Sequence, residues 1–239
     1  MERIIDLQLD KLKTRIIKMC SLVDEQVQAA IKLISEENIT EAESILARDR
    51  KVDKYDLKIG KICQRIFALN QPVAMDLRLI MSALNINTNL ERIGDLAVNI
   101  VDNFTRIKKK PHFFERTKFT EMAAVASEML KNAIDSFIAA DPSIAEKVIR
   151  AETSLDKLNI ENHSVLIEIM KEDKENIEPA VVFLLICRQL ERLGDHATNI
   201  AEDIYFIVEA QTIRHKYLKY FMNEYEIDNE LDSDHEDTD

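Results

Sequence analysis

One eleven-residue segment occurs twice in this chain, and the repetition limits the possible folds more than any other feature of the sequence. Residues 90–100 read LERIGDLAVNI and residues 190–200 read LERLGDHATNI, so most positions are identical at a spacing of 100 residues. Two copies of so specific a segment indicate a duplicated structural unit. We therefore expect the two halves of the chain to share one fold.

The residues between these segments predict long helices. Only 3 Gly and 4 Pro occur in 239 residues, beside 32% charged and 46% hydrophobic residues, a composition typical of an all-α protein. In the first half, apolar residues recur at steps of three and four along residues 3–36, along a second stretch from Asn38 to about residue 70, and along a third from Pro72 to the break at residues 108–111. Three long helices joined by short turns predict an antiparallel bundle.

The second half repeats this pattern. Asn38, the expected N-cap of the second helix, corresponds to Asp141 at an offset of 103, and Pro142 follows at the first helical position, where proline is tolerated. The offset falls to 100 in the third helix, so the preceding turn should be three residues shorter in the second copy. We predict two pseudo-symmetric three-helix bundles, residues 1–110 and 111–222, the second ending in a short helical extension, followed by an acidic tail at 223–239.

Charge and hydropathy exclude several classes of function. The net charge is −12, but without the nine acids of the tail the remaining charge is only −3, and no basic surplus of the kind that binds nucleic acid is present. The N-terminus has no apolar signal-peptide core, and the longest apolar run, residues 180–187, is far shorter than the ~20 residues of a membrane span. Three cysteines without a C-x-x-C motif indicate reduced core residues. We expect a soluble, cytoplasmic protein, peripheral to a membrane at most.

Acidic residues inside the repeated segments form a candidate site. Residues four apart lie on one face of a helix, so Glu91, Asp95 and Asn99 should form one oxygen-bearing stripe. The same spacing recurs in Glu191, Asp195 and Asn199.

A second acidic pair lies on the preceding helix of each half. These pairs are Asp49 with Asp53 and Glu152 with Asp156, again 103 residues apart. Antiparallel packing should bring each pair level with the pair on the third helix. We therefore expect four carboxylates in one shallow patch per bundle.

Two interpretations of these patches remain open. Nearby cations could neutralise the carboxylates in an ordinary salt-bridged surface, with Arg48, Arg50, Lys51, Arg92 and Arg192 as candidates. Alternatively, the patches bind hard divalent or trivalent cations, and an all-oxygen ligand set suits iron, Mn²⁺ or Mg²⁺ better than zinc. His196 could add a ligand in the second half only, or bond to backbone or water. Gly94 and Gly194, inside helices, indicate a close approach of a neighbouring backbone or a ligand.

At these residues the chain resembles the PhoU family of phosphate-signalling regulators. The likeness is carried by residues 71–78 leading into LERIGDLAVNI, by the copy starting at Leu190, and by Arg214-His215, and it covers roughly residues 1–216. It implies two three-helix bundles and metal clusters held by the E/D-x-x-x-D pairs: Asp49, Asp53, Glu91 and Asp95, with Glu152, Asp156, Glu191 and Asp195. Asp49 departs from the commoner Glu, and the likeness assigns no role to the acidic tail.

The resemblance also implies a function. Family members are thought to link a phosphate ABC transporter, through its ATPase subunit, to a sensor histidine kinase, and to restrain the phosphate-starvation response. We therefore expect a non-enzymatic negative regulator of phosphate transport, and we expect it to be a homodimer.

Two functions from other classes compete with this one. A carboxylate-bridged di-iron oxidase would need two Glu-x-x-His motifs facing a bundle core, and the sequence contains neither. A metal-independent helical adaptor, in which the acid pairs bind Arg or Lys of a partner, fits the same residues as the metal interpretation.

Overall fold

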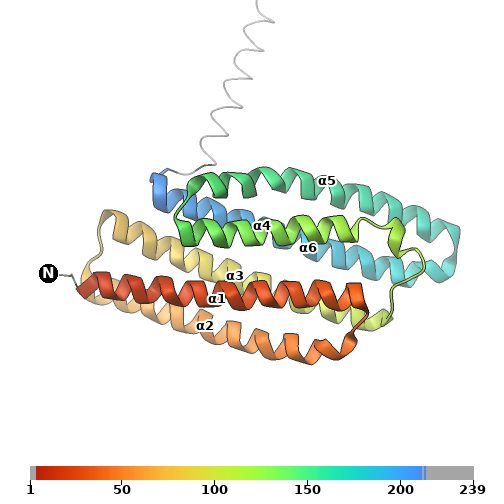
Figure 1. Ribbon diagram of the computed structural model, residues 1–239, viewed down its shortest axis with the longest axis horizontal. Helices are drawn as coiled ribbons and strands as arrows, with labels where there is room; N and C mark the ends of the chain where they lie inside the picture. Colours follow the sequence, from red (N-terminus) through yellow and green to blue (C-terminus); the bar gives the residue numbers. More distant parts are fainter. Residues whose placement is uncertain (1–3, 212, 214–239) are drawn as a thin grey trace, which may run out of the picture.

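Six long α-helices account for most of the computed structural model, which describes residues 4–211 and 213 (Figure 1). They are α1 (Ile4–Glu36), α2 (Ala42–Asn70), α3 (Ala74–Ile107), α4 (Phe119–Ala139), α5 (Pro142–Glu172) and α6 (Ile177–Glu209), and the described residues contain no strand. Short 3₁₀ turns, η1 (Ile39–Glu41), η2 (Phe114–Arg116) and η3 (Lys174–Asn176), lie between them. The all-α prediction is confirmed. The predicted extension to residue 222 and the acidic tail lie outside the described residues, apart from the start of the extension.

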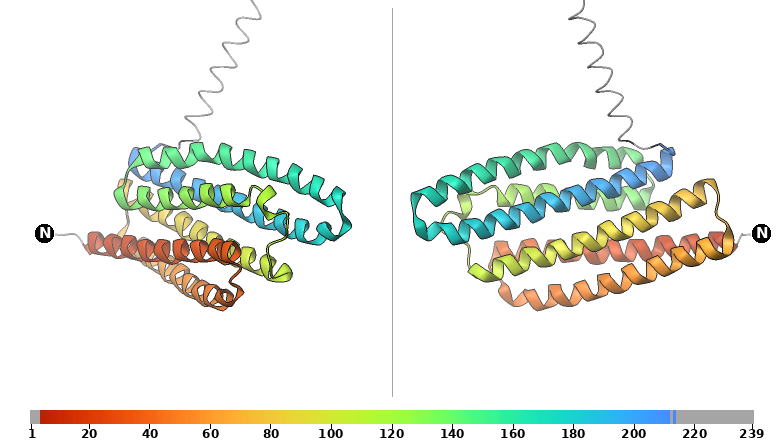
Figure 2. Two further views of the ribbon diagram at one scale, coloured as in Figure 1. Left: turned by 45° about the vertical axis from the view of Figure 1, so that its right-hand side comes forward. Right: turned by 180° about the vertical axis from the view of Figure 1, so that it is seen from behind.

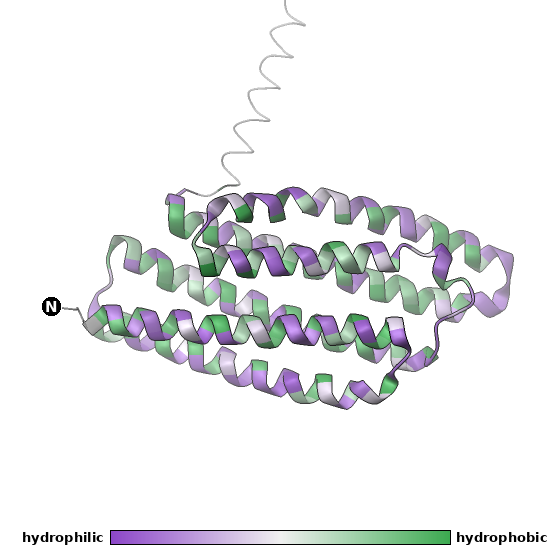
Figure 3. Cartoon of the chain, in the orientation of Figure 1, coloured by the Kyte–Doolittle hydropathy of each residue, from purple (hydrophilic) through white to green (hydrophobic). Residues whose placement is uncertain are grey.

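The apolar periodicity selects the buried face of each helix. The residues that recur along α1 and α3, from Ile5 to Ile34 and from Leu90 to Phe104, are all buried. Hydropathy colouring shows apolar and polar residues alternating along every helix, as expected for amphipathic helices (Figure 3). Near the end of the apolar stretch expected from Asn38 to about residue 70, Leu69 is 65% exposed, one residue before α2 ends.

The two predicted caps behave differently. The Asp141 carboxylate accepts a hydrogen bond from the Ser143 amide at 2.8 Å, and Pro142 occupies the first turn of α5, as expected. Asn38 precedes the 3₁₀ turn η1 and makes no side-chain capping bond to a backbone amide, so its prediction as the N-cap of α2 is wrong. The helical path nevertheless starts at the equivalent position in both copies.

The difference in length between the copies lies in one turn, as predicted. Residues 71–73 join α2 to α3, with Gln71 in the left-handed region at φ 44°. In the second copy Asp173 alone separates α5 from η3, which leads directly into α6. Three residues are therefore missing from the second turn, while the helices on both sides keep their register.

The first helix of the second copy is shorter than its counterpart. α4 has 21 residues and α1 has 33, because the chain crosses between the halves through the segment at Pro111 and the turn η2. Phe113, Phe114 and Phe119 pack against Phe183 of α6, with ring centroids 5.5–6.4 Å apart. This aromatic cluster covers the end of the bundle that the shorter helix leaves open.

The two three-helix units form one body. α3 and α6 run in opposite directions side by side and form the most extensive helix pair, and α1 also contacts α4 (Figure 2). The buried apolar residues of both halves belong to a single cluster. Among the described helices, none combines the length and the apolar character that crossing a bilayer requires.

Candidate functional site

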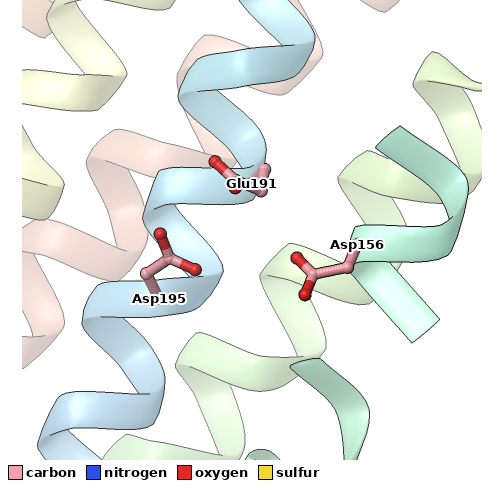
Figure 4. A group of neighbouring side chains, drawn as sticks. All are labelled: Asp156, Glu191 and Asp195. Atoms are coloured by element: carbon pink, nitrogen blue, oxygen red, sulfur yellow. The ribbon is translucent and has the colours of Figure 1, made fainter. Parts of the chain in front are cut away.

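Three carboxylates converge in the second half. Asp156 on α5 and Glu191 and Asp195 on α6 each offer an oxygen atom, and these atoms lie within 4.8 Å of one another (Figure 4). Glu191 and Asp195 are one helical turn apart on the same face of α6, and α5 runs antiparallel beside it. The predicted meeting of these two helices at this level is therefore confirmed for three of the four acids.

The pKa values reflect the crowding of these acids. Partial burial raises the pKa of Glu191, and the neighbouring Asp195 raises it further. Burial and the charge of Asp156 together raise the pKa of Asp195. Arg188 and Arg192 oppose both shifts, and Arg188 donates a hydrogen bond of 2.8 Å to Oε1 of Glu191. Burial and the neighbouring carboxylates thus make ionisation of Glu191 and Asp195 less favourable, and the two arginines compensate only in part.

The donor set fits a hard cation. Oε2 of Glu191 is buried and has no hydrogen-bond partner in the structure, although a buried acceptor normally has one. Asp156 is exposed and Asp195 half-buried, so the opening of the cluster reaches solvent. Carboxylate oxygens are the ligands that Mg²⁺, Mn²⁺ and iron accept, and a cation here would satisfy the free oxygen and remove the mutual repulsion.

The first half brings its carboxylates near one another but less tightly. Burial raises the pKa of Asp49, and Asp53 and Asp95 add to the shift. Burial likewise raises the pKa of Glu91, with smaller contributions from Asp95 and from two acids of α2, Asp53 and Asp56. Within the described part of the chain, the group of three ligand atoms within 4.8 Å occurs in the second half only. The two patches are equivalent in sequence but not in geometry.

A buried glutamine is a further difference between the two patches, and the sequence analysis missed it. Gln26 of α1 is fully buried, and its amide donates hydrogen bonds of 3.0 Å to Asp49 and 3.1 Å to the backbone carbonyl of Gly94. At the offset of 103 its counterpart is Met129, which has no donor. Gln26 therefore links Asp49 of α2 to the backbone of α3, and the methionine at the equivalent place in the second half cannot form this link. A polar residue inside the apolar stripe of α1 was the available signal.

Only some of the arginines predicted to neutralise the carboxylates form ion pairs with them. Arg92 lies 3.7 Å from both Glu91 and Asp95, but it is 58% exposed, and exposed ion pairs contribute little. Arg48 pairs with Glu25 instead of with the patch. Arg188, which was not among the predicted cations, is the one that bonds to Glu191. Each patch therefore has a solvent-exposed arginine beside it, and this arginine offsets only part of the carboxylate charge.

The two glycines have different neighbours. An added Cβ at Gly194 would overlap Cδ2 of Leu155 and lie 3.4 Å from Met129. At Gly94 the same atom would meet Asp49, Val52 and Gln26 at 3.4–3.6 Å, which is ordinary contact. The predicted close approach therefore occurs at Gly194, where the neighbour is a side chain and not a backbone, and a weaker one occurs at Gly94.

The remaining predicted residues do not belong to the converging group. His196 turns toward the other half, where its Nδ1 lies 2.8 Å from Oδ1 of Asn89 on α3, and Asn199 donates to the same oxygen at 3.4 Å. Asn99 is exposed on α3, and half-buried Glu152 is not among the three converging residues. The stripe predicted along α6 therefore divides, because its Asn199 faces the seam between the halves.

Two copies of one three-helix unit, with carboxylate pairs on the second and third helices of each, define a tandem-repeat helical protein with a duplicated anionic patch. A model of the PhoU domain matches residues 16–104 and 119–204. The chain belongs to the PhoU family.

Relatives align over most of their length. The chain is 32% identical over 212 residues to a phosphate-specific transport system accessory protein PhoU homolog of Aquifex aeolicus, which covers 89% of this chain and 96% of the relative. A homolog from Xylella fastidiosa is 31% identical over 86% of this chain and 87% of the relative. The crystal structure of PhoU from Pseudomonas aeruginosa superposes with a TM-score of 0.83 at 27% identity, covering 86% of this chain and 99% of that one.

Proposed function

We propose that this protein regulates phosphate uptake and the phosphate-starvation response. The observation that carries the proposal is the match of the PhoU domain to both halves, together with relatives that are named accessory proteins of the phosphate-specific transport system. The two patches are shallow and partly exposed, which suits a docking or sensing surface better than a sealed reaction centre. The role is regulatory and non-enzymatic.

In this proposal the protein connects two partners in the cytoplasm. One is the ATPase subunit of the phosphate ABC transporter, which would bring the protein to the membrane surface without insertion. The other is a sensor histidine kinase, whose output the protein restrains when phosphate is plentiful. A homodimer would present two copies of each surface.

The proposed regulator carries metal ions on its carboxylates. In the second half Asp156, Glu191 and Asp195 would hold a divalent or trivalent cation, with iron, Mn²⁺ or Mg²⁺ preferred over zinc. The free buried oxygen of Glu191 supports this assignment. In the first half Asp49, Asp53, Glu91 and Asp95 are the ligands, and a bound ion would draw them together.

Deletion of the gene in the host tests the regulatory role. Phosphate-starvation genes should then stay on in phosphate-rich medium, and a plasmid copy should restore repression. Because a genome can encode a second regulator of this type, the double deletion belongs to the same experiment. Repression that persists in the double deletion, with phosphate uptake unchanged, would contradict the proposal.

A metal-independent adaptor is the second candidate. The pairing of Arg92 and Arg188 with the patches favours it, because these cations already offset part of the carboxylate charge. Elemental analysis of protein purified without chelators separates the two functions when the Asp95→Ala, Asp195→Ala double variant is measured beside the parent. Metal in the parent and its loss from the variant favours the first, and equal, negligible metal in both favours the adaptor.

A further inference from the structure

A basic groove lies between α1 and α2, on the outside of the first half. It has a volume of about 410 Å³ and is lined from α1 by Lys18, Ser21 and Leu22, and from α2 by Lys51, Lys54, Tyr55 and Lys58. Half-buried Leu22 and Tyr55 provide its apolar contacts, and the four lysines are exposed. We call these seven residues the basic groove.

The lysines of the basic groove have no anionic partners in the described part of the chain. No carboxylate there lies within 4 Å of any of the four ammonium groups. The amino group of Lys58 instead lies 5.5 Å from the centre of the Tyr55 ring, a weak cation–π contact. Four like charges around one concavity repel one another, so an anionic occupant would be favourable.

Comparison of the two copies shows that the three-helix fold does not require the four lysines of the basic groove. The positions equivalent to Lys18, Lys51, Lys54 and Lys58, 103 residues later, are Glu121, Ser154, Lys157 and Glu161. The same two helices of the second copy therefore carry a single lysine and two acids. Neither helix packing nor the carboxylate patches require lysines in the first copy, so the basic groove is a feature of that copy alone.

The matching anion lies in the same chain. Residues 224–239 contain nine acids and no Lys or Arg, and Tyr225, Ile227 and Leu231 are interspersed among the first of these acids. A segment that alternates acidic with apolar residues complements a groove with lysines at its rim and Leu22 and Tyr55 inside. The phosphate-regulating function assigns no role to this acidic segment.

The acidic segment is long enough to reach the basic groove. α6 packs on α3, and α3 packs on α1 and α2, which makes two interaxial spacings. Because the groove lies on the outer side of α1 and α2, roughly one further helix width is added, so the distance across the molecule is ~30 Å. Lys18 lies about 20 Å along α1 from the N-terminal end of that helix, which is at the same end of the molecule as the C-terminal end of α6 (Figure 1). The 26 residues after Ile213 span up to ~90 Å when extended, enough to pass around the surface.

We propose that residues 224–239 bind in the basic groove of their own chain. Tethering places the acidic segment at an effective concentration of about 1 mM, so modest intrinsic affinity is sufficient for occupancy. The attraction is between exposed charges, and salt should weaken it. The proposal does not depend on the phosphate-regulating function or on the metal sites.

A binding measurement in trans tests the groove. A labelled peptide of residues 224–239 should bind the chain truncated after residue 223, and the affinity should fall about tenfold when Lys51, Lys54 and Lys58 are changed to Glu. The matched control changes Lys147, Lys157 and Lys171, three exposed lysines of α5, to Glu and should alter the affinity less than about twofold. The full chain should bind the peptide about tenfold more weakly than the truncated chain, because its groove is occupied. Equal affinity for parent and groove variant would overturn the proposal.

A measurement in cis identifies the occupant. Carbodiimide, which joins a carboxylate directly to a lysine amine, should cross-link the acidic segment to Lys51, Lys54 or Lys58 in dilute full-length protein. High salt should suppress these links, and a mixture of isotope-labelled and unlabelled chains should show them within one chain. Links that fall equally on Lys147 and Lys157 would contradict the proposal.

Anionic vesicles distinguish the alternative of a lipid surface. Vesicles containing phosphatidylserine should bind the truncated chain through the basic groove more strongly than the full chain, because the acidic segment competes for it. If both chains bind the vesicles equally through these lysines, the membrane and not the acidic segment is the occupant, and the proposal is wrong.

Discussion

At the scale of single residues, equivalent positions in the two copies have different neighbours. Gly94 has ordinary contacts around it, whereas Gly194 lies against Leu155 of α5. Gln26 bonds to Asp49 in the first copy, and Met129 stands in its place in the second. A residue's identity in the repeated motif therefore does not determine its energetic role.

The glycines provide a matched pair of variants. Gly94→Ala should raise stability by up to about 1 kcal/mol, since alanine is the better helix former and the added carbon finds only ordinary contacts. Gly194→Ala gains the same propensity but must displace buried Leu155, which costs about 1–3 kcal/mol. Urea unfolding of both variants measures the difference. Equal stabilities would show that Leu155 moves without cost.

The Gln26 amide should lower the pKa of Asp49, which burial raises. Gln26→Met copies the second half and removes the donor at similar volume, so the pKa of Asp49 should rise further. Carbon-detected NMR titration of the Asp49 carboxyl follows the change, with the distant Asp141 carboxyl as the internal reference. A pKa of Asp49 unchanged by the substitution would mean that the bond does not persist in solution.

At the scale of the elements, the same helical plan tolerates different ends. α5 begins with a side-chain cap on Asp141, whereas α2 follows a 3₁₀ turn without one. α4 lacks the first turns that α1 has, and a cluster of phenylalanines closes the bundle in their place. The interiors of the helices are therefore similar in the two copies. The helix ends differ, because the unpaired backbone groups there are satisfied in a different way in each copy.

Removal of the Asp141 cap should have an effect that depends on pH. The hydrogen bond from Ser143 lowers the pKa of Asp141 below the ordinary 3.8, so its contribution is fully present above that value and is lost as the pH falls through the lowered pKa. Asp141→Ala should lower the melting temperature by a few degrees at pH 7 and by much less near pH 2. Asn38→Ala is the control, and it should have little effect at either pH.

At the scale of the whole molecule, α3 and α6 join the two units along a polar and apolar seam. Asn89 and His196 meet across it, and Asn85 donates to Asp203 at 3.1 Å. The repeated motifs therefore serve two surfaces at once: their acids face the anionic patches, and their neighbouring residues pair the halves.

Metal should stabilise the whole chain. A cation at a hundredfold excess over its Kd adds about 2.7 kcal/mol if only the folded state binds it, which for this length raises the melting temperature by about 5–10 °C. Changing Glu91 and Asp95 to Ala should remove the metal of the first half and spare the second, and changing Glu191 and Asp195 should do the converse. Calorimetry and elemental analysis of the metal-free and loaded proteins measure both effects.

The stability of the variants without metal provides the result that could contradict the metal hypothesis. Each should be no less stable than the metal-free parent, because each loses buried carboxylates and the repulsion between them; burial first, and then the neighbouring charges, raise the pKa values of Glu191 and Asp195. If the variants are clearly destabilised and added metal does not change melting, the acids act as partners of Arg92 and Arg188.

The sequence alone determined the helical class, the repeat, the three-residue deletion in the second turn and the meeting of Asp156 with Glu191 and Asp195. These follow from local periodicity and from antiparallel geometry, which depend little on the neighbouring unit. Tertiary structure decided that Gln26 of α1 holds Asp49 of α2 and that His196 of α6 turns to Asn89 of α3. Both pairings join different helices, and their geometry depends on how the helices rotate and pack, which periodicity does not encode.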